Sequence, residues 1–352
     1  MLADALVFSV EGEPYCWRDV VLSAVQRGEW HAVEQRARQG AACARHADAV
    51  SATLPAGALD AAGRDFRYAH DLVTAQSMEE WLARHELSVQ DWTACLRRQL
   101  LRARWPADLE ELVARYPTSD AEAVQLTVIE ATCCSALDAW ARVLAERAAA
   151  HAFVIASANG AGVPASTAHP ESPEPTYTYP LSVLWGDDAG TVEAAARRLR
   201  RLDQSLTGFR AAQLTEHAVQ AYVSSRQLDW VRFDCRIMAF PDAGMAAEAA
   251  SMLRDDGEGF TSVYQAARTA PRAAQFFLDQ IEDSMRGHFL GSRPGDVIGP
   301  MCVDDEYVLY EIEEKVLPNF KNADVRRRAE EGVLHRALGQ QCEQRVDWRA
   351  AR

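Results

Sequence analysis

Thiols and imidazoles are the side chains of this chain that could act as nucleophiles, general bases or metal ligands. The chain holds 8 cysteines and 9 histidines. The adjacent pair Cys133 and Cys134 cannot chelate one ion on a helix, because neighbouring helical side chains point about 100° apart. No two histidines stand at His-x-x-x-His spacing, and no Gly-x-Ser-x-Gly elbow marks a serine nucleophile. The sequence therefore predicts buried thiols, no catalytic residue and no metal ligand.

Glycine-rich phosphate sites have little support. Residues 160–165 read Gly-Ala-Gly-Val-Pro-Ala and match Gly-x-Gly-x-x-Ala by letter. The Pro-rich stretch that follows cannot form the helix that would hold a pyrophosphate. Gly-x-x-x-x-Gly-Lys-Ser/Thr does not occur in the chain. We therefore predict no nucleotide and no other cofactor.

Several arginines form a basic island in an otherwise acidic protein. The island could hold an acidic peptide segment, or it could form ion pairs with Glu110 and Glu111. A solvated face with salt bridges is the favoured interpretation. The arginines of the island are Arg64, Arg67, Arg97, Arg98, Arg102 and Arg104.

Charge and composition exclude two kinds of partner. The 37 Lys and Arg residues stand against 51 Asp and Glu, so the net charge of −14 repels a nucleic-acid backbone. No 18 uncharged apolar residues run together; even the Ala-rich stretch around Cys133 contains Glu130, Asp138 and Arg142. The N-terminus lacks the basic region of a secretory signal, and scattered cysteines are typical of a reducing compartment. We predict a cytoplasmic protein with no membrane span and no nucleic-acid partner.

The elements of the N-terminal half are mainly helical. Ala5–Val10 and Tyr15–Trp17 have the composition of paired strands that lead into a helix. Apolar residues at spacings of three and four predict several packed helices over Asp60–Trp105. One long helix of roughly 45–50 Å is predicted from Ser119 to about Phe153. Residues 156–180 are rich in Pro, Gly and Ser and predict an exposed linker.

The apolar period changes from three or four to two at Trp230. Alternation of apolar and polar residues predicts a half-buried strand over Trp230–Phe240, with Phe233, Cys235 and Ile237 on one face. Two helices precede this strand, helices and turns follow it, and two strands close the segment. The predicted segments are helices 191–209, 214–225, 242–254, 260–267 and 281–290, a strand entry at 294–300 and a strand at 307–312.

The C-terminal segment 231–316 resembles a parvulin-type peptidyl-prolyl isomerase domain. That family has a first strand, an Ala-rich helix, a Gly-x-x-Phe helix start, a Pro-Gly-x-Val/Ile-x-Gly-Pro turn and a final strand, in this order. The corresponding segments here are Arg236–Met238, Ala246–Leu253, Gly257–Phe260, Pro294–Pro300 and Tyr307–Ile312.

The N-terminal part resembles the helical chaperone module that precedes parvulin domains in SurA-type foldases. The strands of Val7–Trp17 come first, and helices follow them. The tail Asp324–Trp348 would then be a helix that returns to this module, as in those foldases. The helical positions that carry the resemblance are Phe66, Leu72, Trp81, Trp92 and Leu96.

The resemblance implies an α+β fold: a mainly helical, chaperone-like lobe and a small parvulin-like lobe with a short mixed sheet. The implied domains are a SurA-N-like helical domain at 1–155, a Pro/Gly/Ser linker at 156–180 and connecting helices at 181–227. A parvulin-like domain occupies 228–318, and a C-terminal helix at 319–352 packs back on the helical lobe.

The usual polar residues of the family are replaced in this chain. Arg236 falls at the first-strand His, Ala270 near the Cys or Asp, Arg272–Phe277 at the glycine turn and Val308 at the second His. Rotation about an X–Pro bond needs no nucleophile or proton transfer. Its barrier of ~18–20 kcal/mol comes from amide resonance, which an apolar pocket can weaken. We therefore favour peptide binding without catalysis and keep an active isomerase as the alternative.

Apolar residues near the family's proline pocket predict a peptide groove. Met285 stands where the family has an aromatic residue, ten positions before Gly295. Proline binding needs a concave hydrophobic surface with few polar groups. Ordinary core packing explains the same residues and stays open as the alternative. The predicted peptide-binding residues are Arg236, Met238, Phe277, Leu278, Ile281, Met285, Phe289 and Val308.

The predicted function is that of a peptide-binding, chaperone-like foldase homologue with a degenerate parvulin domain. Burial of apolar and Pro-containing side chains, with hydrogen bonds to exposed strand edges, would hold an unfolded or extended peptide. Cytosolic relatives of this architecture are associated with peptide maturation, so the resemblance implies a ribosomally synthesised precursor peptide as the client. The alternatives are an active peptidyl-prolyl cis-trans isomerase and a non-catalytic adaptor in a peptide-maturation complex.

Overall fold

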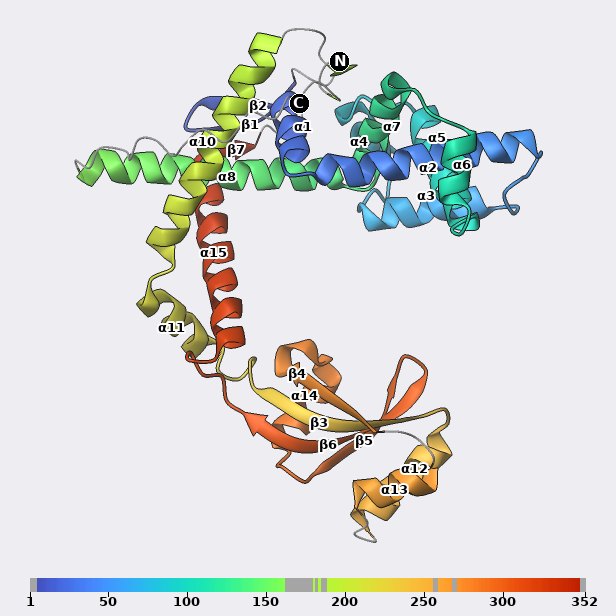
Figure 1. Cartoon of the computed structure of the whole chain (residues 1–352), viewed down its shortest axis with the longest axis vertical. Helices are drawn as coiled ribbons and strands as arrows, with labels where there is room; N and C mark the ends of the chain where they lie inside the picture. The colour runs from blue at the N-terminus through green and yellow to red at the C-terminus, as the bar shows by residue number, and fades with distance from the viewer. Residues whose placement is uncertain are drawn as a thin grey trace. The chain divides into compact units, whose positions relative to one another are not determined.

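The chain divides into two compact units that are described separately (Figure 1). The structure is a computed structural model and describes residues 5–161, 180, 183–184, 189–255, 259–267 and 271–348. The helical unit comprises residues 1–211 and 337–352, and the sheet unit comprises residues 212–336. Helices and antiparallel sheets occur together, which confirms the predicted mixed α+β class.

The helical unit contains a small antiparallel sheet of order β2-β1-β7. The strands β1 (Leu6–Val10) and β2 (Glu13–Cys16) form the predicted hairpin. Its two turn residues have positive φ, and Gly12 takes φ 87° without a Cβ penalty, as a type I′ turn requires. The third strand, β7 (Val346–Trp348), pairs with β1. Residues 346–348 were expected to be helical; the ladder with β1 makes them a strand.

Nine helices of the described residues build most of the rest of the helical unit, around three buried apolar clusters. Tyr15, Leu22 and Leu144 are completely or almost completely buried in one of these clusters, beside Trp30 and Trp140. The helices are α1 (Trp17–Gln26), α2 (Glu29–Ala49), α3 (Ala58–Ala69), α4 (Ala75–Arg84), α5 (Val89–Arg104), α6 (Leu109–Arg115), α7 (Asp120–Cys133), α8 (Ala136–Ala161) and α10 (Ala189–Gln213).

The long helix predicted from Ser119 to about Phe153 is two helices, so this prediction is wrong. The break falls between α7 and α8, where Ser135 adopts a left-handed backbone conformation with φ 58°. The Ser135 hydroxyl lies 3.0 Å from Nε2 of His70, which supplies a polar partner at the break. The segment contains no Gly or Pro that would mark the end of a helix.

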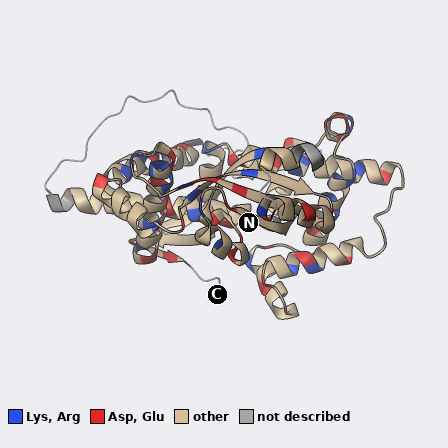
Figure 2. Ribbon diagram, turned by 90° about the horizontal axis from the view of Figure 1, so that it is seen from below, with Lys and Arg blue, Asp and Glu red and all other residues tan. Residues whose placement is uncertain are grey.

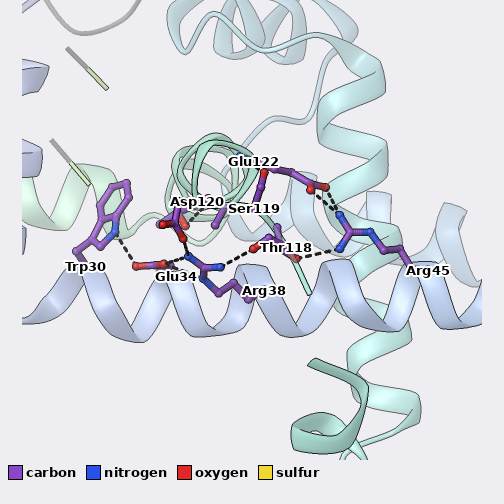
Figure 3. A network of polar contacts seen from close by, with 10 residues as sticks. Trp30, Glu34, Arg38, Arg45, Thr118, Ser119, Asp120 and Glu122 are labelled. Carbon is purple, nitrogen blue, oxygen red and sulfur yellow. Dashed lines mark hydrogen bonds and ion pairs between the residues drawn. The ribbon is translucent and has the colours of Figure 1, made fainter. Parts of the chain in front are cut away.

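A network of charged side chains joins α2 to α7 (Figure 3). Arg38 donates from Nε to Glu34 Oε1 and from Nη2 to Asp120 Oδ1, both at 2.8 Å. Two turns further along α2, Arg45 donates from Nη2 to Glu122 Oε1 at 2.6 Å. The two arginines therefore fix the first turn of α7 against α2.

The sheet unit is built on an antiparallel sheet of order β4-β3-β6-β5. The central strand β3 (Arg232–Phe240) confirms the strand predicted from alternation. Every neighbouring pair is antiparallel, so the short mixed sheet that was expected is wrong. A tight hairpin through Asp304 and Asp305, both with positive φ, sets β5 antiparallel to β6. The other strands are β4 (Arg272–Phe277), β5 (Val297–Val303) and β6 (Glu306–Val316).

Helices of the sheet unit pack on both faces of this sheet. On one face, Met238 of β3 and Leu309 of β6 form a core with α12 and α13. On the opposite face, Phe233 and Cys235 of β3 pack with Phe289 of α14. The helices are α11 (Glu216–Ser225), α12 (Ala243–Arg254), α13 (Phe260–Ala267), the 3₁₀ turn η2 (Leu278–Gln280), α14 (Asp283–Gly291) and α15 (Ala323–Arg345), of which α15 ends in the helical unit.

The segment expected to be a linker at 156–180 begins as helix. Helix α8 continues to Ala161, past the expected start of the linker. Residues 162–179 lie outside the described residues, so most of this prediction stays a prediction.

Charged residues of both signs follow one another along the same helices (Figure 2). On α10, for example, Arg197 lies 3.4 Å from Glu193, and Arg198 pairs with Glu13 of β2 at 2.9 Å. Within the described ranges, none of the helices combines the length and the apolar character that a bilayer crossing requires.

Candidate functional site

The eight predicted peptide-binding residues do not share one surface. Met238 is completely buried against α12 and α13, whereas Leu278, Ile281 and Phe289 belong to the core on the α14 side. The sheet separates these two cores. Completely buried side chains cannot contact a ligand unless the unit rearranges, so most of the eight residues act as the support of a surface and not as the surface itself.

Arg236 lies on the α12 side of the sheet and has partners of its own chain. Its guanidinium forms ion pairs with Glu311 at 2.6 Å and with Glu313 at 3.1 Å. It also stacks over the ring of Phe260, 5.5 Å from the centroid. Arg236, which the resemblance places at the first-strand His of the parvulin family, is therefore neutralised and lies on the side of the sheet away from α14.

Phe277 and Val308 are also engaged within the unit. The guanidinium of Arg328 lies 4.3 Å from the centroid of the Phe277 ring and bonds to Asp279 at 2.9 Å. Val308 is 7% exposed and lies opposite Met301 in the β5–β6 ladder. Residues Arg272–Phe277, which the resemblance predicts at a glycine turn, form strand β4, and Ala270 lies outside the described residues.

The surface that remains on the α14 side is apolar and half-buried. We call it the apolar sheet face. Its residues come from four strands and a helix, and all of them pack on the buried core of that side. They are Ile237 of β3, Phe276 of β4, Met285 of α14, Met301 of β5 and Tyr310 of β6.

Aromatic contacts hold the apolar sheet face in place. The buried ring of Phe289 meets Phe276 at a centroid distance of 5.4 Å and Tyr310 at 5.3 Å, both edge to face. Phe233 packs under Phe289 at 5.4 Å in the same manner. Such pairs each add about 0.5–1.5 kcal/mol beyond the area that they bury. The apolar sheet face is therefore a surface with closely packed aromatic rings beneath it.

A bulge in β5 brings Met301 onto this face. The ladder with β6 shifts register between Ile298 and Met301, so both side chains reach the α14 side although three positions separate them. Gly299 at the bulge has φ 105°, and a Cβ there would lie 2.5 Å from the carbonyl oxygen of Val308. Only glycine allows the two backbones to approach in this way.

Two polar groups, one on the apolar sheet face and one in the core beneath it, stay uncharged at neutral pH. Burial raises the pKa of the Tyr310 hydroxyl above its ordinary value. Burial, together with Asp234 and Glu313, raises the pKa of the Cys235 thiol to about 12. The face therefore offers apolar contact and a neutral hydroxyl, but no ionised nucleophile from these two residues.

Two arginines of the basic island of the helical unit form ion pairs with acids of their own chain. Arg97 pairs with Asp48 at 2.6 Å, and Arg102 lies 3.7 Å from the buried carboxylate of Glu130. These partners differ from the acids of α6 that the sequence suggested. Within the described ranges, no group of three or more His, Cys, Asp and Glu side chains is arranged to hold a metal ion.

The sequence predicted β3 and β6 of the apolar sheet face, together with Met285, but it did not predict strand β4 or that these elements share one face. Alternation placed Phe233, Cys235 and Ile237 on a common face, as the structure has them. Phe276 joins that face because β4 pairs with β3, and Tyr310 joins it because β6 does. Their apolar character was a signal, but strand register was needed to bring them together.

Comparison with known proteins leaves the family open. No protein family, curated protein or solved structure was found to match this chain. The parvulin and SurA resemblance therefore stays a prediction, and function has to be argued from the geometry of the two units.

Proposed function

We propose that this chain is a peptide-binding, foldase-like protein that holds unfolded or extended peptide on the apolar sheet face. In this proposal the sheet unit is a degenerate parvulin-type domain, and the helical unit is a SurA-type chaperone module. The observation that carries it is the half-buried apolar surface around Ile237, Phe276 and Tyr310, supported from below by aromatic rings. An extended chain with apolar or Pro side chains is the ligand that such a surface suits.

The order of elements in the sheet unit supports the same proposal. Strand β3 is followed by α12, α13, β4, α14 and the β5–β6 hairpin, and the resemblance places a strand, helices, a turn and a final strand in that order. Strands β4 and β5 stand at the two ends of the sheet order, where backbone groups can bond to an added strand.

Binding without catalysis is preferred because of the polar groups near the face. Cys235 and Tyr310 are protonated at neutral pH, and Arg236 is paired on the opposite side of the sheet. The polar network that parvulins use to hold a twisted amide has no counterpart in these residues. The proposed client is a ribosomally synthesised precursor peptide, and the proposed compartment is the cytoplasm.

Ile237→Lys tests the proposal. Ile237 lies between β4 and β6 on the apolar sheet face, so a lysine there places a charge where an apolar side chain would bind. We expect the affinity of a fluorescein-labelled, Pro-containing apolar peptide to fall about tenfold, equivalent to about 1.4 kcal/mol. Fluorescence anisotropy with the full chain measures it.

Ala273→Lys is the matched control, because Ala273 is exposed on β4 and pairs with Arg236, on the other side of the same sheet. It should leave the affinity unchanged. Equal loss in both variants, or no saturable binding by the unmodified chain, contradicts the proposal and favours the adaptor. In a protease-coupled assay, acceleration of proline isomerisation that Met285→Ala abolishes would establish the isomerase instead.

A further inference from the structure

A cavity of about 1240 Å³ lies within the helical unit, where segments from both ends of the chain meet. Its walls come from β1 and the start of α1, the end of α4, one side of α8, the last turns of α15 and β7. Small-molecule sites are usually about 300–1,000 Å³. The volume therefore suits a segment of polymer better than a single small ligand.

One wall of the cavity is apolar. Leu6, Val7 and Trp17 line it and are half-buried. Trp348 also lines it and is 44% exposed, although its ring packs at 5.2 Å on Phe8. Two indole rings and two aliphatic side chains offer a place for an apolar side chain of a ligand.

The same wall carries the backbone of β1. Among the described residues, β7 ends at Trp348 opposite Phe8, whereas β1 continues to Leu6 along the cavity. An extended peptide laid beside Leu6 and Val7 would continue the ladder that β7 begins, with main-chain hydrogen bonds to β1.

The opposite wall places two guanidiniums beside one carboxylate. Arg84 ends α4, and Asp138 and Arg142 lie one turn apart on α8. In the described part of the chain, neither arginine has an ion pair within 4.0 Å, and both act on Asp138 from further away. His85 Nε2 is 4.0 Å from Asp138 Oδ1, and its Nδ1 lies 2.8 Å from the Trp81 carbonyl oxygen.

Negative charge is present elsewhere on the lining. Glu146 follows Arg142 by one turn of α8, and Asp347 belongs to β7. Burial, and then the charge of Glu146, raise the pKa of the Cys342 thiol on α15 to about 11. Glu146 therefore lies near the part of the cavity wall that α15 forms. The cavity therefore carries Arg84 and Arg142 beside Asp138 on one wall, and two further carboxylates, on the next turn of α8 and on β7.

We propose that this cavity binds an extended peptide segment in which an apolar side chain packs on Trp17 and Trp348 and a carboxylate engages Arg84 and Arg142. Two arginines that share one half-exposed carboxylate leave positive charge on this wall for an acidic side chain. This proposal takes only the class of its ligand, a peptide, from the proposed function. The site itself is separate, because the apolar sheet face lies in the sheet unit and the cavity lies in the helical unit.

A charge-swap experiment tests this site. The probes are two fluorescein-labelled, extended dodecapeptides of alternating apolar and polar residues; one has a central glutamate, and the other has lysine in its place. Fluorescence anisotropy with the full chain should show about tenfold tighter binding of the glutamate peptide. Arg142→Glu should reverse this preference, because the charged partner of the ligand changes sign. Reversal distinguishes direct contact from a loss of structure.

Arg210→Glu is the control, since Arg210 is an exposed arginine of α10 outside the cavity lining. It should change neither affinity. Equal affinities for the two peptides, or a preference that Arg142→Glu does not alter, overturn the cavity site. If the cavity site fails in this way but Ile237→Lys still weakens peptide binding, the proposed function stands.

A chain shortened to end at Trp348 tests whether residues 349–352 occupy the cavity in place of a client peptide. If the cavity serves a client, shortening the chain should leave the affinity for the glutamate peptide unchanged. A gain of tenfold or more would identify residues 349–352 as the occupant and would overturn the proposal.

Discussion

At the scale of single residues, Asp138 has the clearest electrostatic environment. The neighbouring imidazole of His85, and then Arg142 and Arg84, hold the pKa of this carboxyl below its ordinary 3.8, although burial opposes them. At 4.0 Å the imidazole acts as a nearby charge or dipole and not through a short hydrogen bond. The carboxylate is therefore stabilised in the folded chain more than in the unfolded chain.

The pH dependence follows from the sign of this shift. A folded-state pKa below the unfolded value means that the folded chain binds fewer protons, so Asp138 adds stability above about pH 4, which is lost as the pH falls through the folded pKa. The side chain is 49% exposed, so solvent screening keeps the contribution under about 1 kcal/mol. Asp138→Asn should lower the free energy of unfolding in urea at pH 7, and the difference should shrink towards pH 3.

Asp65→Asn serves for comparison, because Asp65 is an exposed carboxylate of α3. It should have little effect at either pH. A difference for Asp138→Asn that grows as the pH falls would refute the assignment of charge at this position.

The residue types in the sequence limited the chemistry that the chain could carry out. They did not show where in the fold a site would lie. The sequence predicted buried thiols; Cys235 is buried and its raised pKa keeps it protonated at neutral pH, whereas Cys134 and Cys302 are exposed, so the prediction is wrong for those two. Met238 and Met285 were equally good candidates by composition. Only the sheet separates them, with Met238 in the α12 core and Met285 at the edge of the α14 core. Burial on one side or the other depends on tertiary packing.

At the scale of elements, strong periodicity was predictive and short strands were not. The alternation over Trp230–Phe240 predicted β3, and the composition before Trp17 predicted the β1–β2 hairpin. Strand β4 forms because it pairs with β3, and the three residues of β7 form a strand because they pair with β1. Local sequence does not encode such pairing. The break at Ser135 was not predicted for a similar reason, because its polar partner is His70, the residue that follows α3.

The charged network between α2 and α7 gives an element-scale prediction. Arg38→Ala would leave the Glu34 carboxylate, whose side chain is 9% exposed, without the arginine that lies 2.7 Å away. Trp30 Nε1 donates to the same carboxylate, so its charge is not left entirely without a donor. We expect the free energy of unfolding to fall by about 2 kcal/mol, less than the 3–5 kcal/mol for breaking a fully buried pair. Urea unfolding followed by circular dichroism measures it.

Asp120→Ala removes the other partner of the same arginine. The Asp120 side chain is 69% exposed, so its loss should cost less than about 1 kcal/mol. If both variants lose the same stability, the network does not depend on the buried Glu34 carboxylate as described.

At the scale of the whole molecule, the course of the chain decides which segments belong together. The helical unit is closed by residues from both ends, since β7 pairs with β1 and the last turns of α15 line the cavity beside it. The sheet unit is formed by one continuous stretch, 212–336. Of the C-terminal segment 319–352 that was expected to pack back on the helical lobe, the part from Ala337 onward belongs to the unit that the N-terminus begins, whereas residues 319–336 belong to the sheet unit.

Two compact units with separate apolar cores should unfold in two steps. Leu144 is completely buried in the core of the helical unit, and Met238 is completely buried in the sheet unit. Each substitution to alanine should cost its own unit about 2–5 kcal/mol, because it removes buried contacts and leaves a cavity. Differential scanning calorimetry of the full chain should show two transitions, of which Leu144→Ala lowers the Tm of one and Met238→Ala that of the other. A single transition that both variants shift equally would mean that α15, which has residues in both units, couples them into one cooperative structure.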